Sequence, residues 1–384
     1  MKSWKIAIVR DTSKPMLGLH GLHMAFHGLP GVEIAALVDG NPEHLDRKLA
    51  QMRPTRHYLS CEAMFEDLTP DIMVITSRHP GDHLPQIRLA AQHGCHVYCE
   101  KPLARTLEEA YEIQRVVESS GIRLAMAHPA RHAQSFLTLR RMIHSGDIGR
   151  PLTIHGRGKS DHRGGGEDLV VLGTHILDLM AFIFGPPEHV WADITAQGKP
   201  ISRADRTTTV EPIGPCAGDS VVAAFGFAEG VRGIFESHRD VFTTTRSRGY
   251  MGVTVTGTQG ALAVRFEDAG DAVERLLYFH GPCAPEAGVP AQEIPLIEDR
   301  IIPGAAPLEL SRCGELGVPN PMFMKSNRFA AWDLMQAIEH NRPPAVGVAD
   351  ACSVQAMIQG IYASHLSGQR VAFPLTSAVH PLEG

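Results

Sequence analysis

The sequence has no excess of basic residues and no long apolar run. Its 36 Lys and Arg residues are outnumbered by 42 Asp and Glu residues, which gives a formal net charge of -6. Nucleic-acid affinity comes mainly from cations that neutralise phosphates, so this balance argues against a nucleic-acid binder. No stretch approaches the roughly 18 apolar residues that a membrane helix needs, and we expect no membrane partner.

Cysteine is sparse and irregularly spaced. The 384 residues contain seven cysteines, and the closest pair, Cys95 and Cys99, has no second pair at a spacing suited to zinc. We therefore expect reduced thiols and no metal. The chain also runs from Met1 directly into an apolar strand without a signal-peptide pattern, so we expect a soluble, cytoplasmic protein.

The first third of the chain alternates strands and helices. Apolar runs predict strands at residues 5–9, 32–38, 71–76, 96–99 and 124–127. Helix-like stretches lie between them, near residues 21–29, 84–93 and 106–119. This alternation implies right-handed crossovers and a parallel sheet with helices on both faces. We expect a Rossmann dinucleotide-binding domain over residues 1–127.

The pattern changes near residue 128. Helices are expected at 133–145, 327–339 and 350–366, and strands at 152–155, 220–227, 233–237, 253–257 and 371–374. Residues 282–321 contain eight prolines and little periodicity, which indicates an extended loop. We expect a second α/β domain over 128–384, with a large open, mostly antiparallel sheet and helices on one face.

The first βα turn lacks the G-x-G-x-x-G pattern of dinucleotide-binding proteins. Those glycines let the backbone turn tightly and approach a pyrophosphate. Arg10 stands where the first glycine is expected, Pro15 stiffens the loop, and Gly18 and Gly21 come late. Two interpretations remain open: Arg10 or Lys14 pairs with a phosphate instead, or the chain has lost dinucleotide binding.

Asp39 ends the second predicted strand. An acidic residue at this position accepts hydrogen bonds from the adenosine ribose hydroxyls, and its charge repels a 2′-phosphate. Asp39 therefore favours NAD as the cofactor, with NADP possible. The alternative is a plain turn residue, since Asp is common at turns.

Several segments resemble the Gfo/Idh/MocA oxidoreductase family, named for glucose–fructose oxidoreductase, inositol dehydrogenase and a rhizopine-catabolism protein. Residues 99–104, Cys-Glu-Lys-Pro-Leu-Ala, resemble its E-K-P signature. Residues 71–103 resemble its strand, T-x-x-x-x-H loop and helix, and residues 145–149 its S-G-x-I-G transition. Residues 164–178 resemble its G-G-G…G-x-H-x-x-D segment, and residues 255–260 also fit. The resemblance spans nearly the whole chain.

The resemblance implies that Lys101 lies beside the nicotinamide and the substrate carbinol. An ammonium group there stabilises a developing alkoxide or takes part in proton transfer. Glu100 would position it. The cofactor-binding residues implied are Asp39, Thr76, Ser77, His79, Glu100 and Lys101.

His175 matches the family's acid/base histidine, and imidazole suits that work because it titrates near neutrality. Asp178, three residues on, is expected on the same helical face, where it would orient the ring or the substrate. The family often has an Asp four residues before this histidine, and here that position is Val171. Polar support must then come from Glu167, Asp168 or Asp178.

The charged segment around residues 159–168 is the predicted substrate contact. Its side chains would hydrogen-bond several sugar hydroxyls at once, although a solvated loop would look the same. His128 and Arg131 resemble the family's cleft-facing positions. The predicted substrate-binding residues are His128, Arg131, Lys159, Asp161, Arg163 and Asp178, and no metal ligand set fits a standard template.

Two functions remain open from sequence. The first is an NAD(P)-dependent oxidoreductase that moves hydride between nicotinamide and a carbinol carbon of a sugar, polyol or glycoside. The second keeps the fold without dinucleotide binding, as a non-redox sugar lyase or isomerase, or a sugar-binding or regulatory protein. The missing loop glycines favour the second function, whereas the presence of Lys101 and His175 indicates that the pocket still catalyses a reaction. By resemblance we also expect a homodimer or homotetramer.

Overall fold

The computed structural model describes residues 2–10, 20–241, 251–265, 274–281, 288, 290–313 and 321–383. The chain forms two compact units. The first unit comprises Met1–Arg105, Glu109–His132 and Arg300–Cys352. The second unit comprises Thr106–Glu108, Ala133–Asp299 and Ser353–Gly384. Each unit therefore takes segments from several parts of the chain, whereas sequence analysis expects a single boundary after residue 127.

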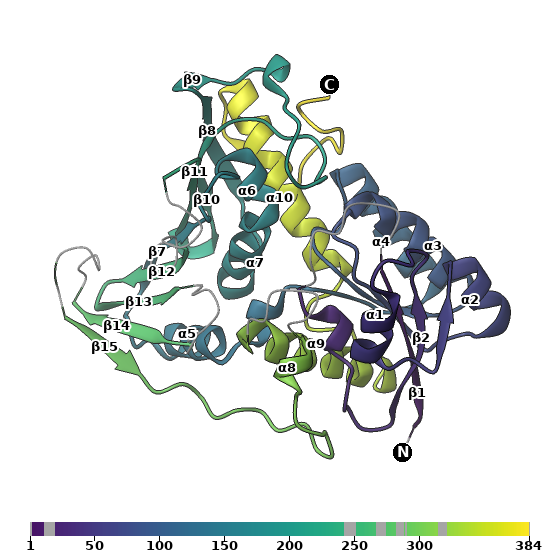
Figure 1. Ribbon diagram of the computed structural model, residues 1–384. Helices are drawn as coiled ribbons and strands as arrows, with labels where there is room; N and C mark the ends of the chain where they lie inside the picture. Colours follow the sequence, from purple (N-terminus) through teal and green to yellow (C-terminus); the bar gives the residue numbers. More distant parts are fainter. Residues whose placement is uncertain are drawn as a thin grey trace. The chain divides into compact units, whose positions relative to one another are not determined.

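The first unit is built on a six-stranded sheet (Figure 1). Its strands are β1 (Trp4–Val9), β2 (Val32–Val38), β3 (Arg56–Tyr58), β4 (Ile72–Ile75), β5 (His96–Cys99) and β6 (Leu124–Met126). They lie in the order β3-β2-β1-β4-β5-β6, and every pairing is parallel. The near-continuous apolar runs are buried, as expected for a parallel sheet covered on both faces. The predicted Rossmann sheet is confirmed.

The helices of the first unit depart from prediction at one point. They are α1 (Leu45–Met52), α2 (Cys61–Asp67), α3 (His83–Gln92), α4 (Leu107–Ser120, whose first residues belong to the second unit), α8 (Leu310–Cys313) and α9 (Pro321–Glu339), with short 3-10 turns η1 (Leu22–Met24), η2 (Pro80–Asp82) and η3 (Pro129–His132). The helix predicted over 21–29 is wrong, because only η1 forms there. Gly21 and Gly28 have φ of 97° and 70°, a left-handed backbone that interrupts a helix.

Helix α9 completes the core of the first unit. Its residues Ala331, Leu334 and Met335 belong to the same buried cluster as Trp4 and Tyr98 of the parallel sheet. The Tyr98 hydroxyl also donates a 2.6 Å hydrogen bond to Asn327 Oδ1 of α9. The first unit therefore closes its core with a helix that is distant in sequence.

The second unit contains a larger sheet. Its strands are β7 (Pro151–Arg157), β8 (His189–Ala196), β9 (Lys199–Pro200), β10 (Ser220–Gly226), β11 (Arg232–His238), β12 (Gly252–Gly257), β13 (Gly260–Arg265), β14 (Leu276–His280), β15 (Ala291–Ile294) and β16 (Val371–Ala372). The order is β15-β14-β13-β12-β7-β11-β10-β8-β16, with β9 beside β8. Among the described pairings β7–β11 is parallel and the others are antiparallel, which confirms the predicted open, mostly antiparallel sheet.

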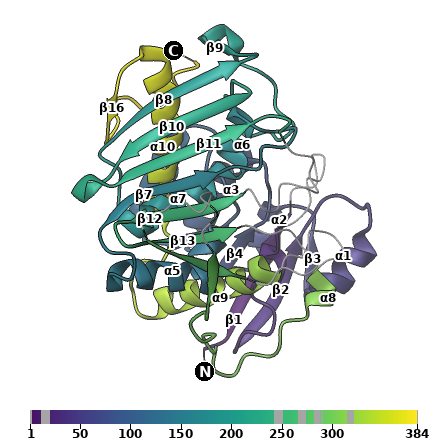
Figure 2. The same cartoon turned by 90° about the vertical axis from the view of Figure 1, so that its left-hand side faces the viewer.

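One face of this sheet is covered by helices. They are α5 (Gln134–Ser145), α6 (Gly166–Val171), α7 (Gly173–Phe184) and most of α10 (Val348–Ser367), which Figure 2 shows behind the strands. Along β8, Val190, Ala192 and Ile194 are buried, whereas Trp191 and Asp193 are exposed. This alternation is typical of a sheet with one packed face.

Part of the predicted loop over 282–321 is ordered structure. Strand β15 lies inside it and pairs with β14, and α8 also forms there, so the prediction is wrong for these residues. The segment AQEI of β15 carries little apolar signal because it is an edge strand paired on one side.

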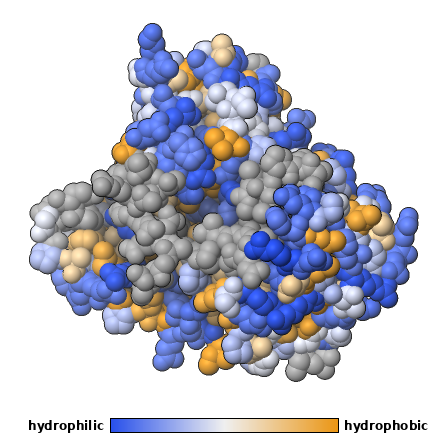
Figure 3. Space-filling model, viewed as in Figure 1, coloured by the Kyte–Doolittle hydropathy of each residue, from blue (hydrophilic) through white to orange (hydrophobic). Residues whose placement is uncertain are grey.

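Large apolar side chains are scattered over the surface rather than gathered. On the face drawn in Figure 3, hydrophobic residues lie singly or in small groups among hydrophilic ones. The exposed large apolar residues described are Leu59, Trp191, Val210, Val241, Ile301, Leu310 and Val379. Single exposed apolar residues are normal, so the site must be found from its polar geometry.

Candidate cofactor and catalytic sites

The predicted cofactor residues of β4 and β5 meet at the carboxyl edge of the parallel sheet. The backbone N–H and the Oγ1 hydroxyl of Thr76 both donate to the carbonyl of Val9, at 3.0 and 2.9 Å. The N–H of Glu100 donates to the carbonyl of Ile75 at 2.9 Å. Dinucleotides bind at this edge of a doubly wound sheet, near the point where the strand order reverses.

Glu100 holds the backbone of Lys101. Its Oε1 accepts the Lys101 N–H at 2.9 Å, and His20 Nδ1 lies 3.3 Å from the same oxygen. Burial raises the pKa of Glu100, but His20 and neighbouring cations outweigh it and the net pKa is lowered. Lys101 itself is buried, and its peptide bond to Pro102 is cis. A negative Glu100 therefore lies directly beside the predicted catalytic lysine.

His83 ties together the loops that follow β4 and β5, and sequence analysis missed it. Its Nε2 lies 2.9 Å from the carbonyl oxygen of Ser77, and its Nδ1 lies 3.0 Å from that of Leu103. The Ser77 hydroxyl in turn donates to Asp82 and accepts the N–H of His79. Its burial could have been predicted from its position, because His83 stands one helical turn before the buried Ile87 and so lies on the buried face of the helix.

A cavity of about 320 Å³ opens beside the ends of β1 and β2. It is lined by Val9, Arg10, Val38, Gly40, Leu59, Ser60, Cys61, Glu62, Asp82, Pro85, Gln86 and Leu89. Leu59 is 71% exposed, so this wall offers unburied apolar surface to a flat ring. The cavity is therefore a candidate site for the adenosine half of a nicotinamide dinucleotide. The predicted loop residues Lys14, Pro15 and Gly18 lie outside the described residues.

Asp39 is not among the residues that line this cavity, although its neighbours Val38 and Gly40 are. The Asp39 Oδ1 accepts the N–H of Asn41 at 3.0 Å, and Oδ2 lies 3.0 Å from Lys48 Nζ and 3.8 Å from Arg10 Nε. Lys48 was not predicted from sequence, because a lysine on a helix is usually exposed to solvent. Its position one helical turn before the buried Met52 was the sequence feature that indicated burial.

The buried His23 of η1 should make the folding stability of the first unit decrease at acidic pH. Burial lowers the pKa of His23 to about 3, and the nearby Arg10 charge acts in the same direction. The folded state then binds fewer protons than the unfolded chain, so this stability is lost as the pH falls below about 6.5. At pH 5 the loss amounts to about 2 kcal/mol relative to pH 8. His23→Leu should remove that loss, measured by urea unfolding at both pH values.

The control for this prediction is His162→Leu, at an exposed histidine of the second unit. It should leave the pH dependence of unfolding as in the wild type. An equal loss of stability between pH 8 and pH 5 in the wild type and His23→Leu would contradict the assignment.

His128 and Arg131 lie together in the first unit. His128 is buried, and its N–H donates to the carbonyl of Met126 at 2.8 Å. Arg131 Nη1 lies 3.0 Å from Asp350 Oδ1 and 3.4 Å from the carbonyl of Ala345. Arg131 is therefore engaged in an ion pair, and its predicted contact with substrate stays a prediction.

The three glycines at residues 164–166 allow close backbone approach in the second unit. A Cβ on Gly164 would lie 2.2 Å from the carbonyl oxygen of His238, and one on Gly166 would lie 2.1 Å from that of Ala217. Gly165 has φ of +86°, and its Cβ would lie 2.5 Å from the backbone of Asp219. No larger residue fits these positions, which explains the glycine run.

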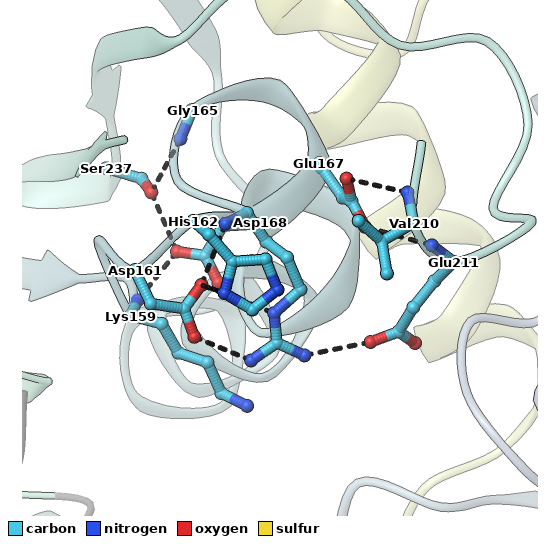
Figure 4. A network of polar contacts seen from close by, with 10 residues as sticks. Lys159, Asp161, His162, Gly165, Glu167, Asp168, Val210, Glu211 and Ser237 are labelled. Carbon is cyan, nitrogen blue, oxygen red and sulfur yellow. Dashed lines mark hydrogen bonds and ion pairs between the residues drawn. The ribbon is translucent and has the colours of Figure 1, made fainter. Parts of the chain in front are cut away.

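Asp168 joins the ends of two strands to this glycine run (Figure 4). Its Oδ2 accepts the Ser237 hydroxyl at 2.7 Å and the Lys159 N–H at 2.6 Å. Ser237 Oγ accepts the N–H of Gly165 at 3.0 Å. Asp168 is fully buried, and burial raises its pKa. The contacts described for this carboxylate therefore serve the loop around residues 158–165.

Glu167 and Arg163 hold a second loop. Glu167 accepts the N–H groups of Val210 and Glu211, at 3.1 and 2.9 Å. Arg163 donates to Asp161 Oδ2 at 2.7 Å and to Glu211 Oε1 at 3.0 Å. Burial raises the pKa of Asp161, but Arg163 outweighs it and the net pKa is lowered. The predicted substrate residues Asp161 and Arg163 thus bind each other.

Lys159 is the third predicted substrate residue of this segment. Its backbone N–H is bound to Asp168, and Figure 4 shows its side chain extending away from Asp168 and Ser237. Asp161 and Arg163 form an ion pair with each other, and the Lys159 side chain is not part of that pair.

The predicted catalytic histidine lies in the first turn of α7. The N–H of His175 donates to the carbonyl of Leu172 at 2.9 Å, and the side chain is buried. Asp178 follows one turn later and is fully buried. The i,i+3 spacing puts the two side chains on one helical face. Their catalytic roles stay predictions.

Metal-ligand clusters and membrane-spanning helices are both absent from the described part of the chain. No group of three or more His, Cys, Asp or Glu side chains there is arranged to hold a metal ion. Within the same residues, no helix has both the length and the apolar character required to cross a bilayer.

A parallel sheet with an adenosine-sized cavity at its carboxyl edge, joined in one chain to a large open sheet, defines a Rossmann-type oxidoreductase architecture. Residues 18–128 match the family described as "Oxidoreductase family, NAD-binding Rossmann fold". Residues 136–263 match the "GFO/IDH/MocA C-terminal domain". The chain belongs to the Gfo/Idh/MocA family of oxidoreductases.

Several curated relatives are named as sugar or polyol dehydrogenases. The chain is 28% identical to scyllo-inositol 2-dehydrogenase (NADP(+)) of Bacillus subtilis, over 49% of this chain and 56% of the relative. It is 27% identical to levoglucosan dehydrogenase of Pseudarthrobacter phenanthrenivorans, over 52% of this chain and 56% of the relative. The chain thus spans about half the length of the curated relatives it matches.

Solved structures share the whole fold. A levoglucosan dehydrogenase in complex with NADH and L-sorbose superposes with a TM-score of 0.73 at 19% identity, covering 98% of this chain and 100% of that one. The WlbA dehydrogenase from Bordetella pertussis, in complex with NADH and UDP-GlcNAcA, gives 0.68 at 19% identity, covering 97% and 99%. At this identity the likeness shows the fold.

Proposed function

We propose that the protein is an NAD(P)-dependent oxidoreductase acting on a hydroxyl carbon of a sugar or polyol. The observation that carries the proposal is the carboxyl edge of the parallel sheet. There an adenosine-sized cavity lies beside β1 and β2, and Glu100 holds Lys101 at the end of β5 in the same sheet. The matched relatives, which act on scyllo-inositol and levoglucosan by name, support the substrate class.

The residues divide the chemistry among them. When bound, the nicotinamide accepts or donates hydride. Lys101 stabilises negative charge on the substrate oxygen, and Glu100 fixes its backbone. His175 takes the hydroxyl proton, and Asp178 orients the His175 ring. Thr76 and Ser77 complete the cofactor edge, and Lys159 reaches substrate hydroxyls.

A second candidate function rests on Arg10. This residue occupies the place of the first loop glycine, and its side chain is buried beside Asp39. A chain that has lost dinucleotide binding would act as a non-redox sugar lyase or isomerase, or bind sugar without reaction.

The proposal also covers the oligomeric state and the cellular location of the protein. We infer a homodimer or homotetramer formed through the helix-free face of the second unit's sheet, where Trp191 is 48% exposed. Burial of such an aromatic side chain is typical of an interface core. A cytoplasmic location suits the five described cysteines, all of them free.

Calorimetric titration of cofactor-stripped protein with NAD and with NADP tests the redox proposal. Micromolar binding of either is expected, and mass spectrometry of untreated protein should detect any retained dinucleotide. Leu59→Asp, on the cavity wall, should weaken binding at least about tenfold because it replaces apolar contact with charge. Ile301→Asp, at an exposed leucine-sized residue away from the cavity lining, is the matched control.

No binding of either dinucleotide at millimolar concentration would refute the redox proposal and favour the second function. Equal affinity in Leu59→Asp and Ile301→Asp would show that the cavity is not the adenosine site.

A further inference from the structure

We propose that Lys48 and Arg10 neutralise Asp39 and thereby let the ribose site accept a 2′-phosphate, so that NADP binds at least as tightly as NAD. The inference rests on the proposed function, because it concerns the same cofactor site. It also reverses the preference that Asp39 alone predicts from sequence.

The carboxylate of Asp39 is engaged at both oxygens. Oδ1 accepts the Asn41 N–H at 3.0 Å, while Oδ2 faces Lys48 Nζ at 3.0 Å and Arg10 Nε at 3.8 Å. A carboxylate that selects NAD must point at the two ribose hydroxyls. Asp39 would have to leave these partners to do so.

Burial makes these ion pairs effective. The side chains of Asp39, Lys48 and Arg10 are 0%, 4% and 2% exposed. Lysine is almost never buried to this degree unless it is paired. Charges withdrawn from water interact more strongly and are screened less by salt than surface charges. Asp39 therefore presents little net negative charge to a ligand.

The arrangement is fixed by its surroundings. Lys48 Nζ also donates to the carbonyl of Asn41 at 3.0 Å, which anchors α1 to the turn after β2. The backbone of Asp39 is held on both sides, because its N–H donates to Tyr58 and its carbonyl lies 2.8 Å from His57 Nε2. With the backbone and Lys48 held in this way, reorienting the carboxylate would break its contacts with Asn41, Lys48 and Arg10.

The charge balance at the end of β2 then favours a phosphate. Among the described residues, two cations face one carboxylate there, and Arg10 also lines the adjoining cavity. Arginine is the side chain best suited to phosphate oxygens. Two carboxylates line the same cavity and oppose this effect: Asp82, which accepts the Ser77 hydroxyl, and the exposed Glu62, which solvent screens.

The test is calorimetric titration with NAD, NADP, ADP and 2′,5′-ADP at fixed ionic strength. The two fragments separate a pyrophosphate from a 2′-phosphate. Wild-type protein should bind NADP at least as tightly as NAD, and 2′,5′-ADP more tightly than ADP. Lys48→Met should raise the Kd ratio of NADP to NAD at least about fivefold, since it exposes the phosphate to an unbalanced Asp39 charge.

Two further variants keep the test decisive if Lys48→Met does not fold. Lys48→Arg retains the charge and should keep the wild-type ratio. Arg10→Gly restores the usual loop glycine and should shift the ratio toward NAD. Preferential binding of NAD by the wild type, by tenfold or more, would overturn the inference while leaving the redox proposal intact. Failure of both dinucleotides to bind would instead overturn the redox proposal, and the inference with it.

Discussion

Lys101→Met should abolish turnover of the sugar or polyol while the fold and dinucleotide binding persist. The substitution keeps the aliphatic stem of a buried side chain and removes the ammonium that stabilises the developing alkoxide. Loss of a single group of this kind costs about 10²- to 10³-fold in kcat. Because Glu100 accepts the backbone N–H of residue 101, which the substitution keeps, the loop should keep its geometry.

The measurement is kcat on the best substrate from a panel of sugars and polyols, with Kd for the dinucleotide measured in parallel. Lys101→Ala should behave like Lys101→Met. Lys199→Met, at an exposed lysine of the second unit, is the matched control and should retain wild-type activity. A Lys101→Met enzyme with activity near the wild type would remove Lys101 from the mechanism.

The sheet of the first unit was predictable because each of its main strands is a run of buried apolar residues. Such runs need no knowledge of the rest of the chain, since a strand covered on both faces is apolar throughout. The short β3 (Arg56–Tyr58) carries no such run and was not predicted. The return of residues 300–352 to the first unit was also invisible, because helical periodicity shows that α9 has an apolar face but not which sheet it covers.

The candidate site was predictable where a motif has a local cause. The Glu100–Lys101 pair is such a case, because its hydrogen bond joins adjacent residues. The glycine run at residues 164–166 was visible as a run, but the backbone that it approaches, at Ala217, Asp219 and His238, is distant in sequence. The state of Asp39 was not predictable, because its neutralisation depends on Arg10 and Lys48 arriving from separate elements. The same holds for Asp168, whose carboxylate is committed to Ser237, 69 residues away in sequence.

His175→Ala should lower kcat at least about 10²-fold, the usual cost of losing an acid/base group. The Kd for the dinucleotide should not change, because His175 belongs to the second unit and the cofactor cavity is lined by the first. His144→Ala, at an exposed histidine of the same unit, is the matched control and should keep wild-type activity. Added imidazole should partly restore the His175→Ala rate, since the free base can occupy the space left by the ring. Rescue would separate proton transfer from a packing role, which imidazole would not repair. A near-normal rate without imidazole would assign proton transfer to another residue.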